Sequence, residues 1–176
     1  MADTATLEPK ERDIIDIFRF NDCPSLDEAG HMELANATPE LEAGIGKALE
    51  AGFAEGNVVK TLFSKPGFSL TYAWFKSGFP LPLHTHNADC LYYIVAGTLQ
   101  LGNETLGPGD GFFVPEDKAY RYTPGPEGVE VLEFRHKEDF NIDFLAKTTG
   151  VWDKITQSIT DKREGWTRET PPSQTA

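Results

Sequence analysis

The sequence predicts an antiparallel all-β jelly roll with a helical extension at each end. Eight short runs of β-branched and aromatic residues, separated by Gly, Pro, Asn and Asp, fill the stretch from residue 57 to residue 135. No helical pattern separates these runs, which is typical of an antiparallel sandwich or barrel, and eight is the strand number of a jelly roll. The runs are 57–63, 68–75, 81–86, 90–96, 98–102, 111–115, 119–123 and 129–135.

The length of 176 residues corresponds to one compact domain with one core. An apolar content of 39 % is that of a globular protein and excludes wholesale disorder. We expect three segments: an N-terminal helical extension over 1–56, a β-barrel over 57–136, and a C-terminal helix with a disordered tail over 137–176.

The N-terminal extension contains one clear helix signal. Thr38 is a helix-capping residue, Pro39 suits the first helical position, and apolar residues follow every four positions at Leu41, Ile45, Leu49 and Phe53. This pattern predicts an amphipathic helix whose apolar stripe faces a core. The earlier apolar run 14–18 fits either an added strand or a helical turn.

The C-terminal extension predicts a second helix, with Val151, Trp152, Ile155 and Ile159 on one face. The last ten residues, 167–176, are rich in Pro, Ser and Thr, and we expect them to fray.

The net charge of −12 argues against partners that carry phosphate. An acidic surface repels nucleic-acid backbones and anionic lipid headgroups, so a small neutral or apolar molecule is the expected ligand. The N-terminus lacks the pattern of a signal peptide and no apolar run is long enough to span a bilayer, which predicts a soluble, cytoplasmic protein. The two cysteines, Cys23 and Cys90, fit two reduced thiols, and a bridge between them stays open.

His84 and His86 form the strongest candidate site. Residues two apart in a strand point to the same face, so the two imidazoles project side by side and can share one metal ion. Gly97 fits a tight turn between the runs 90–96 and 98–102, and Gly109 and Pro115 bound the next strand.

These residues resemble the two motifs of the cupin superfamily, whose members are double-stranded β-helix barrels. Gly78, His84, His86 and Gly97 match the first motif in register, and Gly109 and Pro115 match the second. The resemblance covers roughly residues 57 to 136. It implies a cupin barrel with a divalent metal ion, iron or zinc, bound inside.

Three positions depart from the cupin pattern. Cys90 stands where the family has a ligand Glu, Tyr120 replaces the third ligand His, and Asp117 replaces a Gly. Only His84 and His86 therefore carry over as ligands, while Cys90 and Tyr120 are candidate metal ligands and catalytic residues by position. A Cys90 thiolate would favour zinc, and a Tyr120 phenolate would favour ferric iron.

Each candidate also has a plainer structural interpretation. Cys90 fits a small buried apolar residue, and Tyr120 with Tyr122 fits an aromatic pocket wall. Tyr92 shares the strand face of Cys90, so we expect it to line the same cavity.

One further strand carries charged candidates. Glu133 and Arg135 share a face, on which they pair with each other or, if that face is the interior, orient a substrate and move protons. His136 faces the other way, which predicts a solvated surface residue, with a substitute ligand role as the alternative.

The expected function is that of a metal-dependent cupin enzyme, either a dioxygenase, and so an oxidoreductase, or a lyase or isomerase. The apolar pocket suits an aromatic or carbonyl substrate. One alternative is a non-catalytic module that senses a small molecule, and another is a structural building block. Cupin barrels pair through their outer strands, so the resemblance also implies a homodimer or a higher homo-oligomer.

Overall fold

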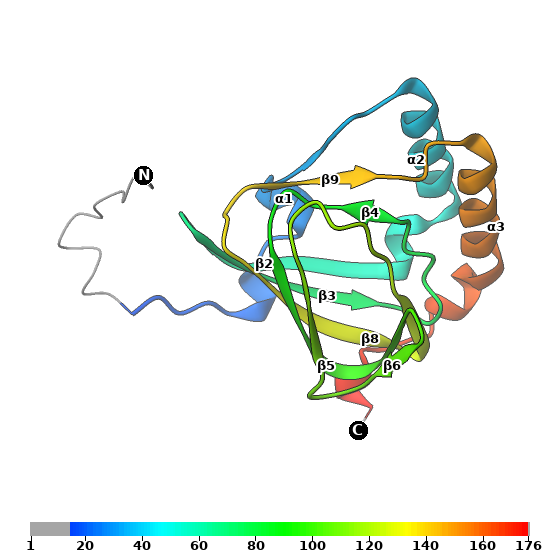
Figure 1. The fold of residues 1–176 in the computed structure, drawn as a ribbon. Coiled ribbons are helices and arrows are strands. Elements are labelled where there is room, and N and C mark those ends of the chain that lie inside the picture. The colour runs from blue at the N-terminus through cyan, green and yellow to red at the C-terminus, as the bar shows by residue number, and fades with distance from the viewer. Residues whose placement is uncertain (1–14, 176) are drawn as a thin grey trace.

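The computed structural model describes residues 15–175, which form two β-sheets with helices packed beside them (Figure 1). One sheet has the strand order β2-β3-β8-β5-β6, with β7 also paired to β5, and the other has the order β1-β9-β4. The strands are β1 (Met32–Leu34), β2 (Asn57–Lys65), β3 (Phe68–Phe75), β4 (His84–Thr85), β5 (Cys90–Leu101), β6 (Glu104–Leu106), β7 (Gly111–Val114), β8 (Thr123–Arg135) and β9 (Phe140–Phe144). The helices are η1 (Phe20–Asp22), α1 (Leu26–Ala29), α2 (Pro39–Ala51), η2 (Phe53–Gly56), α3 (Thr149–Trp166) and η3 (Pro172–Gln174).

β5 is a 12-residue strand that pairs on both of its edges. It runs along β8 on one side and along β7 and then β6 on the other. The predicted turn at Gly97 is wrong, because β5 continues through this residue. Gly97 instead lies at an irregularity in the pairing with β8, with φ +73°, and a Cβ there would lie 2.2 Å from the carbonyl oxygen of Gly128. The close approach of the two backbones therefore requires glycine.

The second sheet lies largely outside the region that the sequence predicts as strands. β1 and β9 pair in parallel, and both belong to segments that the sequence analysis assigned to the helical extensions. Of the predicted strand 119–123, Tyr120 forms only an isolated bridge with His84, and Thr123 is the first residue of β8. Together with the helices α2 and α3, these differences mean that the fold is not purely all-β.

α2 begins where the sequence predicts it. The Thr38 side chain accepts a hydrogen bond of 3.2 Å from the backbone N–H of Leu41, and Pro39 occupies the first turn. The buried face, however, is formed by Leu41, Gly44 and Ala48, whereas Leu49 is 52 % exposed. A repeat of four residues drifts around a helix that has 3.6 residues per turn, so the predicted stripe leaves the buried face by Leu49.

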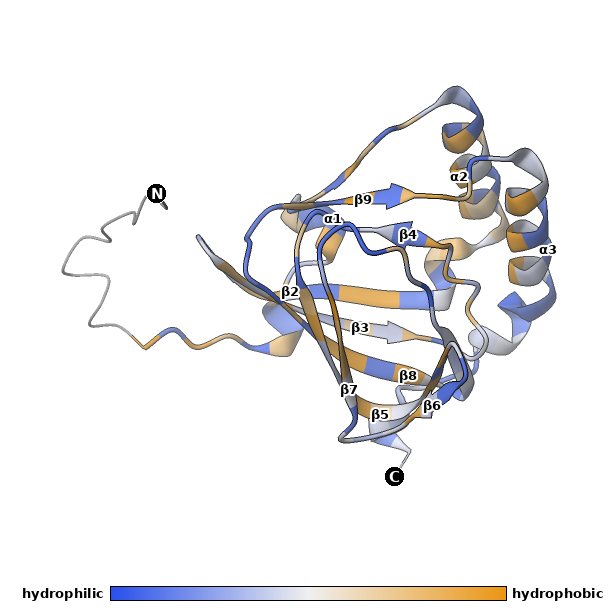
Figure 2. Cartoon of the chain, in the orientation of Figure 1, coloured by the Kyte–Doolittle hydropathy of each residue, from blue (hydrophilic) through white to orange (hydrophobic). Residues whose placement is uncertain are grey.

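α3 packs against α2 and closes one end of the molecule. Its buried residues include Trp152, Ile155 and Ile159, as predicted, whereas Val151 is 41 % exposed. Both helices carry alternating apolar and polar bands (Figure 2). The indole of Trp152 lies against Gly44, where an added Cβ would come within 2.3 Å of the ring. The missing side chain at Gly44 therefore sets the close packing of the two helices.

The two ends of the described chain differ from the prediction. Residues 15–19 form neither a strand nor a helical turn, and Ile14 lies outside the described residues. The C-terminal residues, predicted to fray, instead form η3, in which Ser173 donates two hydrogen bonds to the buried carboxylate of Glu130. A buried carboxylate needs donors, and the C-terminal segment supplies them.

No helix within residues 15–175 is long and apolar enough to cross a membrane. Both cysteines are free thiols, Cys90 buried and Cys23 half-buried.

Candidate functional site

His84 and His86 lie side by side inside the barrel. His84 belongs to β4, His86 follows this strand by one residue, and their ring centroids are 4.9 Å apart. The exposed fractions of the two residues are 3 % and 7 %. The side-by-side placement predicted for this pair is therefore present in the structure.

Each imidazole is held through its Nδ1 atom by a backbone carbonyl. The Nδ1 of His84 lies 2.7 Å from the carbonyl oxygen of Pro82, and the Nδ1 of His86 lies 2.5 Å from that of Asn141. A carbonyl oxygen only accepts hydrogen bonds, so Nδ1 carries the proton and Nε2 keeps its lone pair. Among residues 15–175 the structure gives neither Nε2 a hydrogen-bond partner.

The surroundings keep both rings neutral. Burial lowers the pKa of His84, and burial lowers the pKa of His86 to about 3, helped by the positive charge of Arg135. Two neutral imidazoles with free Nε2 atoms are thus present at neutral pH.

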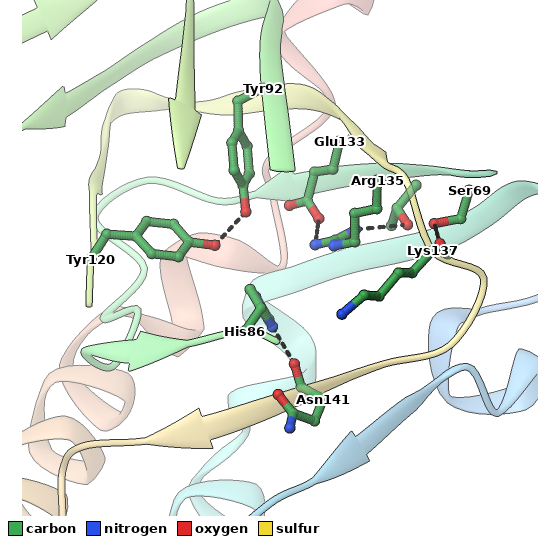
Figure 3. A network of polar contacts seen from close by, with 9 residues as sticks. Ser69, His86, Tyr92, Tyr120, Glu133, Arg135, Lys137 and Asn141 are labelled. Atoms are coloured by element: carbon green, nitrogen blue, oxygen red, sulfur yellow. Dashed lines mark hydrogen bonds and ion pairs between the residues drawn. The ribbon is translucent and has the colours of Figure 1, made fainter. Parts of the chain in front are cut away.

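Tyr92, Tyr120 and Tyr122 form a packed group beside the histidines, called here the tyrosine cluster. The hydroxyl of Tyr92 is hydrogen-bonded to that of Tyr120 (Figure 3), and the ring of Tyr120 lies 4.5 Å from that of His84. Tyr92 also stacks on Phe112 at 4.4 Å. Burial raises the pKa of all three tyrosines, so their hydroxyls are protonated.

Cys90 is buried at the start of β5, opposite Arg135 on β8. Burial raises the pKa of its thiol to about 12, so the thiol is protonated at neutral pH. Within residues 15–175, no group of three or more His, Cys, Asp or Glu side chains is placed to hold a metal ion. The structure therefore brings the two histidines together without adding Cys90 to them as a third ligand.

Glu133 and Arg135 point into the interior from β8, and His136 is exposed. The guanidinium of Arg135 donates to Glu133 at 2.5 Å (Figure 3) and to Thr71 at 3.3 Å. The ring of Phe140 covers the guanidinium at 4.0 Å. Glu133 and Arg135 therefore both pair with each other and lie in the interior.

A cavity of about 590 Å³ lies between the two sheets and reaches these polar groups. His86, Glu133 and Arg135 border it, while most of the remaining wall is aliphatic and aromatic. This wall includes Ile45, Ala48, Phe75, Phe79, Phe144 and Trp152.

The predicted pocket residues divide into two groups. His86 and Glu133 line the cavity, whereas Tyr92, Tyr122, Tyr120 and Cys90 are not among its lining residues. They are buried in the main hydrophobic core instead.

Sequence reasoning missed the side of the cavity that β9 and α2 form. Ile142 and Phe144 line it from β9, and the carbonyl of Asn141 on the same strand holds His86. The alternation of apolar and polar residues in 140–144 was the available signal for this strand.

Comparison with solved structures places this architecture among known folds. RemF, a polyketide cyclase from Streptomyces resistomycificus, matches with a TM-score of 0.50 and 17 % identity, over 60 % of this chain and 82 % of its own. An RmlC-like cupin from Shewanella frigidimarina matches with a TM-score of 0.43 and 22 % identity, over 47 % and 78 % of the two chains. KdgF from Halomonas sp. matches with a TM-score of 0.42 and 24 % identity, over 47 % and 82 %.

The chain has a cupin fold. No protein-family profile matches the sequence, and a comparison with curated protein sequences also finds no match. The similar structures therefore confirm the resemblance of the two motifs to cupins at the level of the fold.

The cupin barrel explains one departure from the motifs in backbone terms. Asp117, which stands where cupins have glycine, adopts φ +60°, and its N–H donates to the carbonyl of His86 at 2.8 Å. A left-handed conformation is unfavourable for a residue with a Cβ, although Asp tolerates it better than most. The turn next to His86 therefore keeps its glycine-type geometry with a strained residue.

The donor set of this barrel fits a metal ion through two nitrogens. A histidine that binds a metal through one ring nitrogen commonly donates its other N–H to a carbonyl, as His84 and His86 do. Cys90 and Tyr120 each hold a proton that a metal would have to displace before either atom could coordinate it.

Proposed function

We propose that this chain is a metal-dependent cupin enzyme that acts on a small molecule bound in the cavity. The observation that supports this is the pair of Nδ1 hydrogen bonds to the carbonyls of Pro82 and Asn141. They orient two neutral imidazoles and leave both Nε2 atoms free for one metal ion.

His84 and His86 would hold the metal, iron or zinc, and Cys90 or Tyr120 is the proposed third ligand. A bound metal ion supplies Lewis-acid polarisation of a carbonyl or activation of O₂, which corresponds to a lyase, an isomerase or a dioxygenase. The cavity would exclude water and accept an aromatic or carbonyl compound. RemF, named as a polyketide cyclase, is one enzyme with a similar fold.

A sensor is the second candidate function, and the tyrosine cluster favours it. The position that would provide a third ligand is occupied by Tyr120, whose hydroxyl is already paired with Tyr92. A cupin that binds a small molecule without a metal would need only the cavity.

We further propose that the chain forms a homodimer through the outer face of β5 and β7. Leu91 and Phe113 are direct neighbours in the register of these strands, and they are 51 % and 58 % exposed. Adjacent exposed apolar side chains are typical of interfaces between copies. Sedimentation of wild type and Leu91→Asp tests this: a dimer that dissociates supports it, and a wild-type monomer contradicts it.

Metal content tests the enzyme proposal directly. The chain has four histidines, so a His84→Ala, His86→Ala variant has a matched control in His31→Ala, His136→Ala. We expect about one equivalent of metal in the wild type and in the control after anaerobic purification, and loss of the metal in the first variant. Equal metal content in the two double variants would contradict the proposal, and metal-free protein that still binds ligand would support the sensor.

Cys90→Ser separates the roles of the thiol. Loss of metal with the circular dichroism spectrum unchanged assigns Cys90 as a ligand, and unchanged metal content assigns it to packing.

A further inference from the structure

The guanidinium of Arg135 has hydrogen-bond donors that the protein does not use. An arginine side chain carries five N–H groups, and two of these donate here, one to Thr71 and one to Glu133. Its Nε is buried without a partner among residues 15–175, and the residue is 3 % exposed. One N–H on each of Nη1 and Nη2 also has no acceptor among residues 15–175, and because Arg135 lines the cavity a ligand there can supply one.

The carboxylate of Glu133 is also only partly used. Its Oε2 accepts the hydrogen bond from Arg135, while the structure gives Oε1 no hydrogen-bond partner among residues 15–175. Both residues line the cavity. A free carboxylate oxygen and free guanidinium donors therefore lie together at the polar end of an apolar chamber.

The charges at this end favour a neutral ligand. Glu133 already pairs with Arg135, so in the metal-free protein an added anion would bring a second buried negative charge to a single cation. The other cation of the cavity wall, Lys60, already donates to the carbonyls of Phe20 and Cys23 at 3.0 and 2.9 Å. A carbonyl oxygen on an apolar body supplies an acceptor to Arg135 and adds no charge.

We propose that Glu133 and Arg135 form an acid–base site that removes a proton next to the carbonyl group of an apolar ketone. This activity goes beyond the proposed metal chemistry and shares with it only the cavity as binding site. The apolar wall would hold the body of the ketone, and its oxygen would accept a hydrogen bond from Arg135.

The step conserves charge. The bond between the α-carbon and its hydrogen breaks, the proton moves to Oε1 of Glu133, and the electron pair moves to the carbonyl oxygen, which becomes an enolate oxygen. Before the step Arg135 is paired with the carboxylate, and after it Arg135 is paired with the enolate while Glu133 is neutral. The low-dielectric surroundings strengthen this second pair without any new net charge. Return of a proton from Glu133 restores the ketone or places the proton at a different carbon.

Exchange of α-protons for deuterium in D₂O measures this step without knowledge of the natural substrate. The probes are 1-indanone and 2-octanone, followed by NMR on chelator-treated protein, so that bound metal plays no part. We expect the wild type to exchange at least one probe faster than buffer, and Glu133→Gln to lower the protein-dependent rate about 100-fold. Glu133→Asp keeps the negative charge, but its shorter side chain moves the carboxylate oxygen away from the ketone, so this variant should also lower the rate.

Glu130→Gln is the matched control, because Glu130 is a second buried glutamate on β8 that contacts Tyr72 and Ser173 and does not line the cavity. This variant should keep the wild-type exchange rate. Exchange no faster than buffer for both probes, or equal rates in Glu133→Gln, Glu133→Asp and the wild type, would overturn the proposal. Neither result bears on the metal content, so the two proposals fail independently.

Discussion

The barrel interior has two unlike halves. On one side, called here the packed half, the tyrosine cluster and Cys90 belong to the main hydrophobic core, and the hydroxyls of Tyr92 and Tyr120 are hydrogen-bonded to each other. The other side, called here the hollow half, contains the cavity, and there Arg135 has unused donors beside the carboxylate of Glu133. His84 and His86 lie between the two halves: Tyr120 packs on His84, and His86 borders the cavity.

The comparison shows that the residues at the motif positions are not the residues with unused polar groups. Cys90 and Tyr120 occupy the positions of metal ligands in the cupin motifs, yet they lie in the packed half with their protons retained. The unused polar groups of Glu133 and Arg135 lie in the hollow half, at positions that neither motif marks. In this barrel, motif register and unsatisfied polar groups therefore point to different residues.

The substitution with the largest expected effect on stability is Arg135→Met in the hollow half. This change leaves the Glu133 carboxylate buried without its cation, and we expect a loss of about 3–5 kcal/mol in the free energy of unfolding. The double variant Arg135→Met, Glu133→Gln buries no unpaired charge and should lose clearly less in urea unfolding. Equal losses in the two variants would show that the ion pair does not determine the stability of this half.

The packing of Trp152 in the cavity wall against α2 can be tested by substituting Gly44. A Gly44→Ala methyl would meet Trp152, which also lines the cavity, so overpacking should lower the stability by about 1–3 kcal/mol. Gly46 on the same helix has open space around its Cβ position, and Gly46→Ala should raise the stability by about 0.5–1 kcal/mol. Thermal and chemical unfolding measure both, and a stabilising Gly44→Ala would contradict the close packing.

In the packed half, the hydrogen bond between the Tyr92 and Tyr120 hydroxyls can be removed by substitution. Tyr92→Phe and Tyr120→Phe each leave one buried hydroxyl without its partner, at a cost of about 1–2 kcal/mol. In the double variant no hydroxyl is orphaned, so its loss should be smaller than the sum of the two single losses. Strict additivity in this double-mutant cycle would mean that the two hydroxyls do not interact.

The smallest expected effect is at the strained turn beside His86. Asp117→Gly removes the left-handed strain but adds freedom to the unfolded chain, and the balance should be a gain of about 0.5 kcal/mol. Asp117→Ala, which keeps a Cβ at φ +60°, is the control and should lose stability in the same assay. A loss with glycine would show that the Asp117 side chain stabilises the turn.

Local patterns in the sequence predicted the parts of this structure that depend on local geometry. The cap at Thr38, the side-by-side placement of His84 and His86, and the shared face of Glu133 and Arg135 all follow from helix and strand geometry, whereas the sequence left open whether that shared face is the interior. The cupin motifs also predicted the fold.

The rest depends on contacts between segments far apart in the chain. Gly97 looked like a turn because the close approach of Gly128 is invisible in the sequence. Strand periodicity placed Tyr92 and Cys90 on an interior face but did not show whether that interior is packed or hollow. The position of the cavity depends on where β9 and α2 pack, which no local pattern specifies.

A zinc titration followed by ¹⁵N NMR of the histidine side chains tests the central claim most directly. The account predicts that His84 and His86 begin with the proton on Nδ1, and that both Nε2 resonances shift together and saturate at one equivalent of zinc. The resonances of His31 and His136 should stay unchanged at that point. Protons on Nε2 before zinc is added, or Nε2 resonances that do not respond to it, would contradict the claim that these two imidazoles form a metal-binding pair.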